Sequence, residues 1–182
     1  MNPFYSALRE AALQSDARAD PRLQASLERA RAFGVREIAV FASATESFAQ
    51  ANLNSTVEGS LERFGEVIRS AKSEGVRVRG YISMCFGDPW EGDVAPDQVL
   101  RVADRLFAEG VDELSLGDTI GVATPRQVEA LIGRMQDRIS RLAVHFHDTY
   151  GQALANTMTA LDLGVRTDPE AVGLRRAATL YG

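Results

Sequence analysis

Two histidines, one residue apart, are the side chains with the clearest capacity for chemistry. His145 and His147 follow the apolar run 142–144 and precede Asp148. Side chains alternate across a β-strand, so a strand here would place both imidazoles on one face, where they can bind one metal ion together. A solvated strand end with two incidental histidines is the alternative for a bare His-x-His pattern. The patterns in the rest of the chain are needed to choose between a metal site and incidental histidines.

Short apolar segments alternate with longer amphipathic segments along most of the chain. The dipeptide Gly-Val recurs at residues 34, 75, 110 and 164, each time where a helix is expected to end before a strand. The predicted strands are 35–41, 76–83, 111–116 and the segment around 142–147, and predicted helices begin near residues 2, 20, 55, 96, 124 and 153. Ser55 and Glu58 form a predicted capping box, and the helix from residue 124 is expected to reach Ile139.

Each predicted strand ends in polar or ionisable side chains, which include Ser43, Ser83, Asp118 and His145. Alternating helices and strands imply parallel strands, and chemistry at their carboxyl ends is typical of a (β/α)8 barrel. No Gly-x-Gly-x-x-Gly follows a predicted strand, which weakens the case for a dinucleotide-binding fold. A complete barrel takes about 250 residues, whereas this chain shows four strands and at most a fifth that begins at Val165.

We therefore predict an α/β fold that is a partial (β/α)8 TIM barrel, with about four to five parallel strands alternating with helices. The expected organisation is a helical N-terminal leader at 1–19, a partial barrel domain at 20–167 and a divergent C-terminal tail at 168–182.

The composition limits the classes of partner. The 182 residues include 20 basic and 25 acidic ones, and the net charge of −5 argues against a protein that binds nucleic acid through its phosphate backbone. No apolar run is long enough to cross a membrane. The single cysteine, Cys85, excludes an internal disulfide and suits a reducing compartment, and the acidic N-terminus lacks the features of a secretory or transit peptide. We expect a cytoplasmic protein with no nucleic-acid or membrane partner.

Three stretches of the chain resemble hydroxymethylglutaryl-CoA lyase, a family of the metal-dependent lyase and Claisen-synthase TIM-barrel superfamily. The stretches are Arg79–Ser83 with Gly87–Gly92, Ser115–Pro125, and His145–Asn156. The resemblance covers about residues 21–165. The related isopropylmalate and homocitrate synthases share the His-x-His and the Asp-Thr but typically have Asn-Asp after the second histidine, so the run Asp148–Gln152 favours the lyase.

The resemblance implies a reaction, a cofactor and a set of site residues. Family members cleave 3-hydroxy-3-methylglutaryl-CoA to acetyl-CoA and acetoacetate in leucine degradation, so the implied partner is an acyl-CoA substrate. His145 and His147 match two ligands of a divalent metal ion, usually Mg²⁺ or Mn²⁺. Asp118 matches a carboxylate that would orient a histidine or assist proton transfer, so His145 and Asp118 are the implied catalytic residues. Arg79 and Thr119 are the implied substrate contacts.

Simpler structural roles compete with these assignments. On local sequence alone, Asp118 serves equally well as the N-cap of a helix that starts at Thr119. Arg79 needs a partner for its charge within a strand, and an ion pair in the barrel interior accounts for it as well as a substrate does. Glu91 fits a loop contact better than an acid catalyst, and Cys85 fits a small buried hydrophobe better than a catalytic thiol.

Several residues of the family have no counterpart in this chain. They are an Arg-Asp pair on the first barrel strand, a glutamate on the second, a Gly-Gly-Cys-Pro loop and an asparagine ligand near the last. We therefore expect a truncated, rearranged or frame-disrupted product with an incomplete catalytic set. A related acyl-CoA lyase or synthase is one alternative, and a non-catalytic half-barrel that self-associates is another. The open sheet edges of a half-barrel predict a homo-oligomer.

Overall fold

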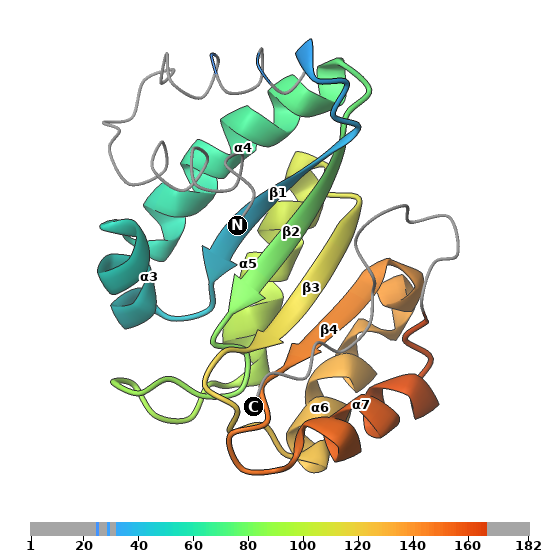
Figure 1. The fold of residues 1–182 in the computed structure, drawn as a ribbon. Coiled ribbons are helices and arrows are strands. Elements are labelled where there is room, and N and C mark those ends of the chain that lie inside the picture. Colours follow the sequence, from blue (N-terminus) through green and yellow to red (C-terminus); the bar gives the residue numbers. More distant parts are fainter. Residues whose placement is uncertain (1–24, 26–28, 30–31, 167–182) are drawn as a thin grey trace.

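Four parallel strands form one sheet whose spatial order follows the sequence (Figure 1). The computed structural model describes residues 25, 29 and 32–166. The strands are β1 (Glu37–Ser43), β2 (Arg77–Ser83), β3 (Glu113–Asp118) and β4 (Leu142–Phe146), in the order β1-β2-β3-β4. Each strand pairs in parallel with the next one, as consecutive units do in a (β/α)8 barrel. The predicted partial barrel is therefore confirmed.

Helices connect the strands and cover one face of the sheet. They are α3 (Glu46–Leu53), α4 (Val57–Ser73), α5 (Pro96–Glu109), α6 (Pro125–Ile132) and α7 (Ala153–Asp162), with the 3-10 segment η1 (Gly133–Arg141) before β4. In Figure 1, α5 lies behind the sheet, and α6 and α7 lie beside β4. Gly110 ends α5 in a left-handed conformation with φ of 107°, which glycine adopts without strain, so this Gly-Val boundary is confirmed.

The helix α3 lies between β1 and α4 and does not follow from the sequence pattern. Only Ala49 and Leu53 of its eight residues are buried, so its apolar stripe is too short to show a helical period. The helix ends at Asn54, which adopts a left-handed conformation with φ of 48°. Asparagine tolerates this conformation better than most residues.

Two other helix boundaries differ from the predictions. The N-cap of α4 is Thr56, whose Oγ1 accepts a hydrogen bond from Gly59 N at 3.0 Å, so the predicted Ser55–Glu58 capping box is wrong. The helix expected to reach Ile139 ends at Ile132, and the chain continues as the 3-10 segment, in which Met135 and Arg138 depart from helical dihedral angles.

The alternation of side chains separates an apolar face of the sheet from a polar face. The residues of the apolar face that join the helices in one core are Ile38, Val40, Ala42, Val78, Ile82, Leu114, Leu116, Leu142, Val144 and Phe146. On the polar face, Arg79 lies opposite Glu113, and Gly117 lies opposite His145 in register. This face corresponds to the interior of a closed barrel.

Several predictions fall on or beyond the limits of the described residues. The helix near residues 2–13, the leader at 1–19 and the tail at 168–182 lie outside them. Ala25, Arg29 and Ala32 are helical, in agreement with a helix that ends before Gly34, and Val165 does not start a strand within the described part. Among the described residues, no helix is both long enough and apolar enough to cross a membrane.

Candidate functional site

The two histidines lie side by side at the carboxyl end of β4. Val144 and Phe146 are buried in the core, and the alternation of the strand turns His145 and His147 toward the opposite face. The centroids of the two imidazole rings are 5.0 Å apart, and their planes make an angle of 49°. Gly117 faces His145 across the β3–β4 register, so the neighbouring strand contributes no side chain at that position.

The electrostatic surroundings favour a neutral imidazole at His145. Partial burial lowers the pKa of His145, and electrostatic interactions with His147 and Arg79 lower this pKa further. A neutral imidazole keeps a lone pair that a metal ion can accept, whereas an imidazolium has none. His145 therefore has the protonation state that a metal ligand needs at neutral pH.

The residues present fit a divalent ion as part of its ligand set. Two imidazoles on one side of a strand suit neighbouring positions around one ion, and water or substrate oxygens can occupy others. The described part of the chain has no group of three or more His, Cys, Asp or Glu side chains that could hold a metal. The role of His145 and His147 as ligands stays a prediction.

Asp118 is bound by the loop that follows β3. It is 1% exposed, and its carboxylate accepts hydrogen bonds from Val122 N at 2.9 Å and Ala123 N at 3.1 Å. It does not cap a helix, because α6 begins after Thr124. Burial raises the pKa of Asp118, and the hydrogen bonds from Ala123 and Val122 and the electrostatic interaction with His147 offset part of this rise. Asp118 thus organises the loop, and its catalytic role stays a prediction.

Arg79 forms an ion pair on the polar face. Its Nη1 lies 3.0 Å from Glu113 Oε1, and both side chains are almost fully buried. The guanidinium also lies 5.1 Å from the centroid of the Tyr81 ring, which stacks on Phe41 with centroids 4.8 Å apart. The interior ion pair that was the alternative interpretation of Arg79 is therefore present. The contact of Arg79 with a substrate stays a prediction.

Thr119 links the ends of two neighbouring strands. Its Oγ1 accepts a hydrogen bond from Met84 N at 2.9 Å. Met84 has a φ of 61°, which is uncommon for a residue with a side chain, and this hydrogen bond helps to hold it there. Thr119 lies at the carboxyl end of β3, as predicted, but its contact with a substrate stays a prediction.

The loop at residues 87–92, here called the Asp88 loop, depends on a carboxylate to which the sequence pattern assigned no role. Asp88 is 4% exposed. Its Oδ2 accepts from Thr45 Oγ1 at 2.7 Å, and its Oδ1 accepts from Trp90 N at 2.7 Å and Glu91 N at 2.9 Å. Burial acts to raise the pKa of Asp88, but these hydrogen bonds outweigh it and hold the pKa below its ordinary value. The only local signal is an aspartate before a proline, which is typical of a turn.

The structure confirms the simpler roles of two other residues. Glu91 makes a loop contact, in which its Oε1 accepts a hydrogen bond from Ser47 N at 2.6 Å. Cys85 is 2% exposed, its thiol donates to Ile82 O at 3.1 Å, and burial raises the pKa of this thiol to about 12. A thiol with such a pKa is unreactive at neutral pH.

Comparison with known proteins agrees with the predicted resemblance. The family described as HMGL-like matches residues 8–168. A 3-hydroxy-3-methylglutaryl-CoA lyase from Rattus norvegicus, named as cytoplasmic, is 47% identical over 154 residues, which are 84% of this chain and 45% of that protein. Other relatives are named as mitochondrial.

A relative from Pseudomonas aeruginosa, named 3-hydroxy-3-isohexenylglutaryl-CoA/hydroxy-methylglutaryl-CoA lyase, is 50% identical over 144 residues, which are 78% of this chain and 48% of that protein. The solved structure of an HMG-CoA lyase from Acinetobacter baumannii, in complex with coenzyme A and 3-methylmalate, matches with a TM-score of 0.73 and 25% identity over 88% of this chain and 55% of the other. The chain thus spans less than half the length of the two curated relatives.

Proposed function

The chain belongs to the HMGL-like family, and from this premise we propose that it is built for the metal-dependent cleavage of 3-hydroxy-3-methylglutaryl-CoA to acetyl-CoA and acetoacetate. The observation that carries the proposal is the pair of adjacent imidazoles at the carboxyl end of β4, inside the stretch that the family matches. Catalytic residues of (β/α)8 enzymes gather at this end of the strands. The relatives described above are all named as lyases, which favours the lyase over the synthase alternative.

Each predicted site residue has a proposed role in this reaction. His145 and His147 would hold Mg²⁺ or Mn²⁺, which when bound polarises substrate oxygens and lowers the cost of forming an alkoxide. Asp118 positions the loop beside His147 through its hydrogen bonds to that loop. Arg79 supplies a fixed positive charge on the polar face, and Thr119 lies where a strand end meets the substrate.

The proposed substrate class is a CoA thioester with a branched 3-hydroxy acyl group. The names of the relatives support this class, because one of them acts on both 3-hydroxy-3-isohexenylglutaryl-CoA and hydroxymethylglutaryl-CoA, and another has been solved with coenzyme A. Acetoacetate and acetyl-CoA as products would place the reaction in leucine degradation. The single cysteine supports a reducing compartment, for which we propose the cytoplasm.

Titration with Mn²⁺, followed by electron paramagnetic resonance, tests the metal site. The chain should bind Mn²⁺ weakly, because the described residues supply only two ligands, and a His145→Ala, His147→Ala double variant should lose this binding. Asp137→Asn, which removes an exposed carboxylate, is the control for non-specific binding and should change nothing. Equal binding with and without the histidines would rule the site out.

A coupled assay for acetoacetate, with Mg²⁺ and Mn²⁺ added, tests the reaction. We expect turnover close to background, because a catalytic unit that lacks even one or two of its groups loses most of its rate. Robust turnover that His145→Ala abolishes would support the lyase and contradict the incomplete catalytic set. An absence of turnover together with an absence of histidine-dependent Mn²⁺ binding would contradict the proposed function.

We also propose that the chain self-associates. Leu154, Met158 and Leu161 follow helical spacing along one side of α7 and are 64%, 53% and 39% exposed, which makes an apolar stripe that water solvates poorly. At the other edge of the sheet, Phe41 is 40% exposed on β1. Light scattering on the purified chain should show a dimer or a larger species, and Met158→Lys should shift it toward the monomer. A monomer at micromolar concentration would contradict this proposal.

A further inference from the structure

The Asp88 loop holds Trp90 in solvent. Trp90 is 62% exposed, although Asp88 at the base of the same loop is 4% exposed. The loop closes on itself through hydrogen bonds from Asp88 N to Gly92 O at 2.8 Å and from Gly92 N to Asp88 O at 2.9 Å. The backbone N–H of Trp90 itself donates to Asp88 Oδ1 at 2.7 Å. Keeping a large indole in water has a free-energy cost, and a rigid exposed tryptophan is typical of a binding hot spot.

The helices that follow β1 and β3 brace this loop and the residue before it. On the β1 side, Ser47 N at the start of α3 donates to Glu91 Oε1 at 2.6 Å. On the β3 side, Gln127 Nε2 in α6 donates to the main-chain oxygen of Phe86, the residue just before the loop, at 3.2 Å. The indole therefore stands on a support that is fixed from two directions, so a partner that binds it loses little loop entropy.

Trp90 and the histidines lie at the same end of the sheet. In Figure 1, the loop after β2 projects from the arrowhead end of the strands, where β4 also ends. Since β3 is the only strand between β2 and β4, the two strands lie about 10 Å apart. A CoA thioester whose acyl group reached the histidines would have to extend its pantetheine arm and its nucleotide across the loops at this end.

We propose that Trp90 is a stacking platform for the adenine ring of coenzyme A, a proposal that rests on the acyl-CoA substrate proposed above. Adenine is the flat aromatic group of coenzyme A, and stacking of a base on an aromatic side chain contributes about 1–3 kcal/mol. Arg126 is exposed on the first turn of α6 and forms no ion pair with the other described residues. Its charge at the same end of the sheet complements the phosphates of the nucleotide.

Fluorescence tests this proposal directly, because Trp90 is the only tryptophan of the chain. Coenzyme A added to the full chain should quench the emission of Trp90 until the site is saturated. Adenosine 3′,5′-bisphosphate, which keeps the adenine and lacks the pantetheine arm, should also quench it. Pantetheine, which lacks the adenine, should leave the emission unchanged.

Calorimetric titration with coenzyme A measures what the indole contributes to affinity. Trp90→Ala should weaken binding about tenfold, within the range that a lost stacking contact gives, and Trp90→Phe should lose less because it keeps an aromatic face. Phe33→Ala is the matched control, since Phe33 is another exposed aromatic residue, 85% exposed, before β1 at the other end of the sheet. It should bind coenzyme A as the native chain does, and circular dichroism should show native folding in all three variants.

Each remaining outcome overturns the proposal in a different way. Binding of coenzyme A that Trp90→Ala leaves unchanged would refute the stacking and leave the acyl-CoA substrate in place. If pantetheine quenched the emission as strongly as coenzyme A does, Trp90 would contact the pantetheine arm and not the adenine ring. An absence of any calorimetric binding of coenzyme A would refute both the stacking and the proposed substrate class.

Discussion

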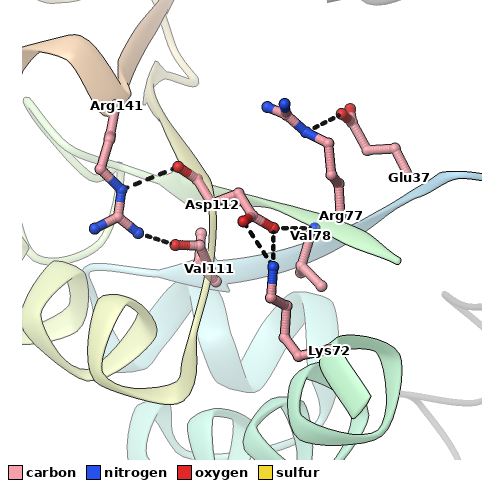
Figure 2. A network of polar contacts seen from close by, with 7 residues as sticks. All are labelled: Glu37, Lys72, Arg77, Val78, Val111, Asp112 and Arg141. Carbon is pink, nitrogen blue, oxygen red and sulfur yellow. Dashed lines mark hydrogen bonds and ion pairs between the residues drawn. The ribbon is translucent and has the colours of Figure 1, made fainter. Parts of the chain in front are cut away.

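The two ends of the sheet use charged side chains in different ways. At the amino end, Asp112 receives hydrogen bonds from Lys72 Nζ at 2.7 and 2.8 Å and from Val78 N at 2.7 Å. Arg141 donates to the main-chain oxygens of Val111 and Asp112 in the same network (Figure 2). Acidic and basic groups neutralise one another here and join β2, β3, α4 and the segment before β4.

At the carboxyl end, the aspartates accept hydrogen bonds from the main chain. Asp88 and Asp118 each receive two backbone N–H groups of their own loops, and Asp148 receives Ala153 N at 2.9 Å at the start of α7. These contacts fix the loops around the histidines through main-chain N–H donors. The difference indicates that charge at the amino end joins separate elements of the fold, whereas charge at the carboxyl end orders individual loops beside the site.

The buried ion pair between the two ends should give the largest effect on stability. Arg79→Met leaves Glu113 charged in a buried position, and removal of one partner of such a pair costs about 3–5 kcal/mol of the free energy of unfolding, measured with urea. Arg77→Met is the matched control, because the Arg77 pair with Glu37 has a separation of 3.5 Å and is partly exposed. The control should lose about 1 kcal/mol or less. Similar losses in both variants would mean that burial does not determine how much the ion pair between Arg79 and Glu113 contributes to stability.

The amino-end network should contribute to stability alone. Asp112→Ala leaves the backbone N–H of Val78 without its side-chain acceptor, which costs about 1–3 kcal/mol in the free energy of unfolding. Mn²⁺ binding at the histidines should not change. Asp97→Ala breaks an exposed pair with Arg134 and serves as the control, with an expected loss below about 1 kcal/mol. A change of Mn²⁺ affinity in Asp112→Ala would show that the amino-end network also affects the histidine site at the carboxyl end.

The Asp88 loop should make the free energy of unfolding depend on pH. The pKa of Asp88 is lowered in the folded chain from its ordinary value of 3.8, because the hydrogen bonds to its carboxylate outweigh its burial. A lowered folded pKa adds stability that is present above the unfolded pKa, at about pH 4, and is lost as the pH falls through the folded pKa. The free energy of unfolding of the native chain, measured with urea, should therefore fall more steeply below about pH 4 than that of the Asp88→Asn variant.

Asp162→Asn is the control for this experiment, because Asp162 is exposed at the end of α7. It should follow the pH dependence of the native chain. If the Asp88→Asn curve ran parallel to the native one through this range, the hydrogen bonds of Asp88 would not favour its ionised form as described.

The histidines should have the smallest effect on stability. His147→Ala removes a partly exposed side chain and should change the free energy of unfolding by no more than about 0.5 kcal/mol, while Mn²⁺ affinity falls. Lys72→Ala, at the amino end, should show the reverse pattern because its contacts serve the Asp112 network. A large loss of stability in His147→Ala would show that the imidazole supports the fold rather than a site.

The sequence predicts those features that depend on local periodicity. The shared face of His145 and His147 follows from strand alternation alone, and the helix end at Gly110 follows from the freedom of glycine. The link between Asp88 and Thr45 joins positions 43 residues apart, so no local pattern contains it. Asp118 was ambiguous because an N-cap and a loop acceptor both receive backbone N–H groups a few residues downstream.

The order of the strands has a consequence for synthesis on the ribosome. Each strand pairs with the one made just before it, so every newly emerged unit finds its partner already present and closes only one crossover. Such local pairing allows folding to advance from the first strand to the last while translation continues. At every stage the most recent strand exposes an unpaired edge, so a pause in translation after β3 would leave that edge open to other nascent chains until β4 emerges.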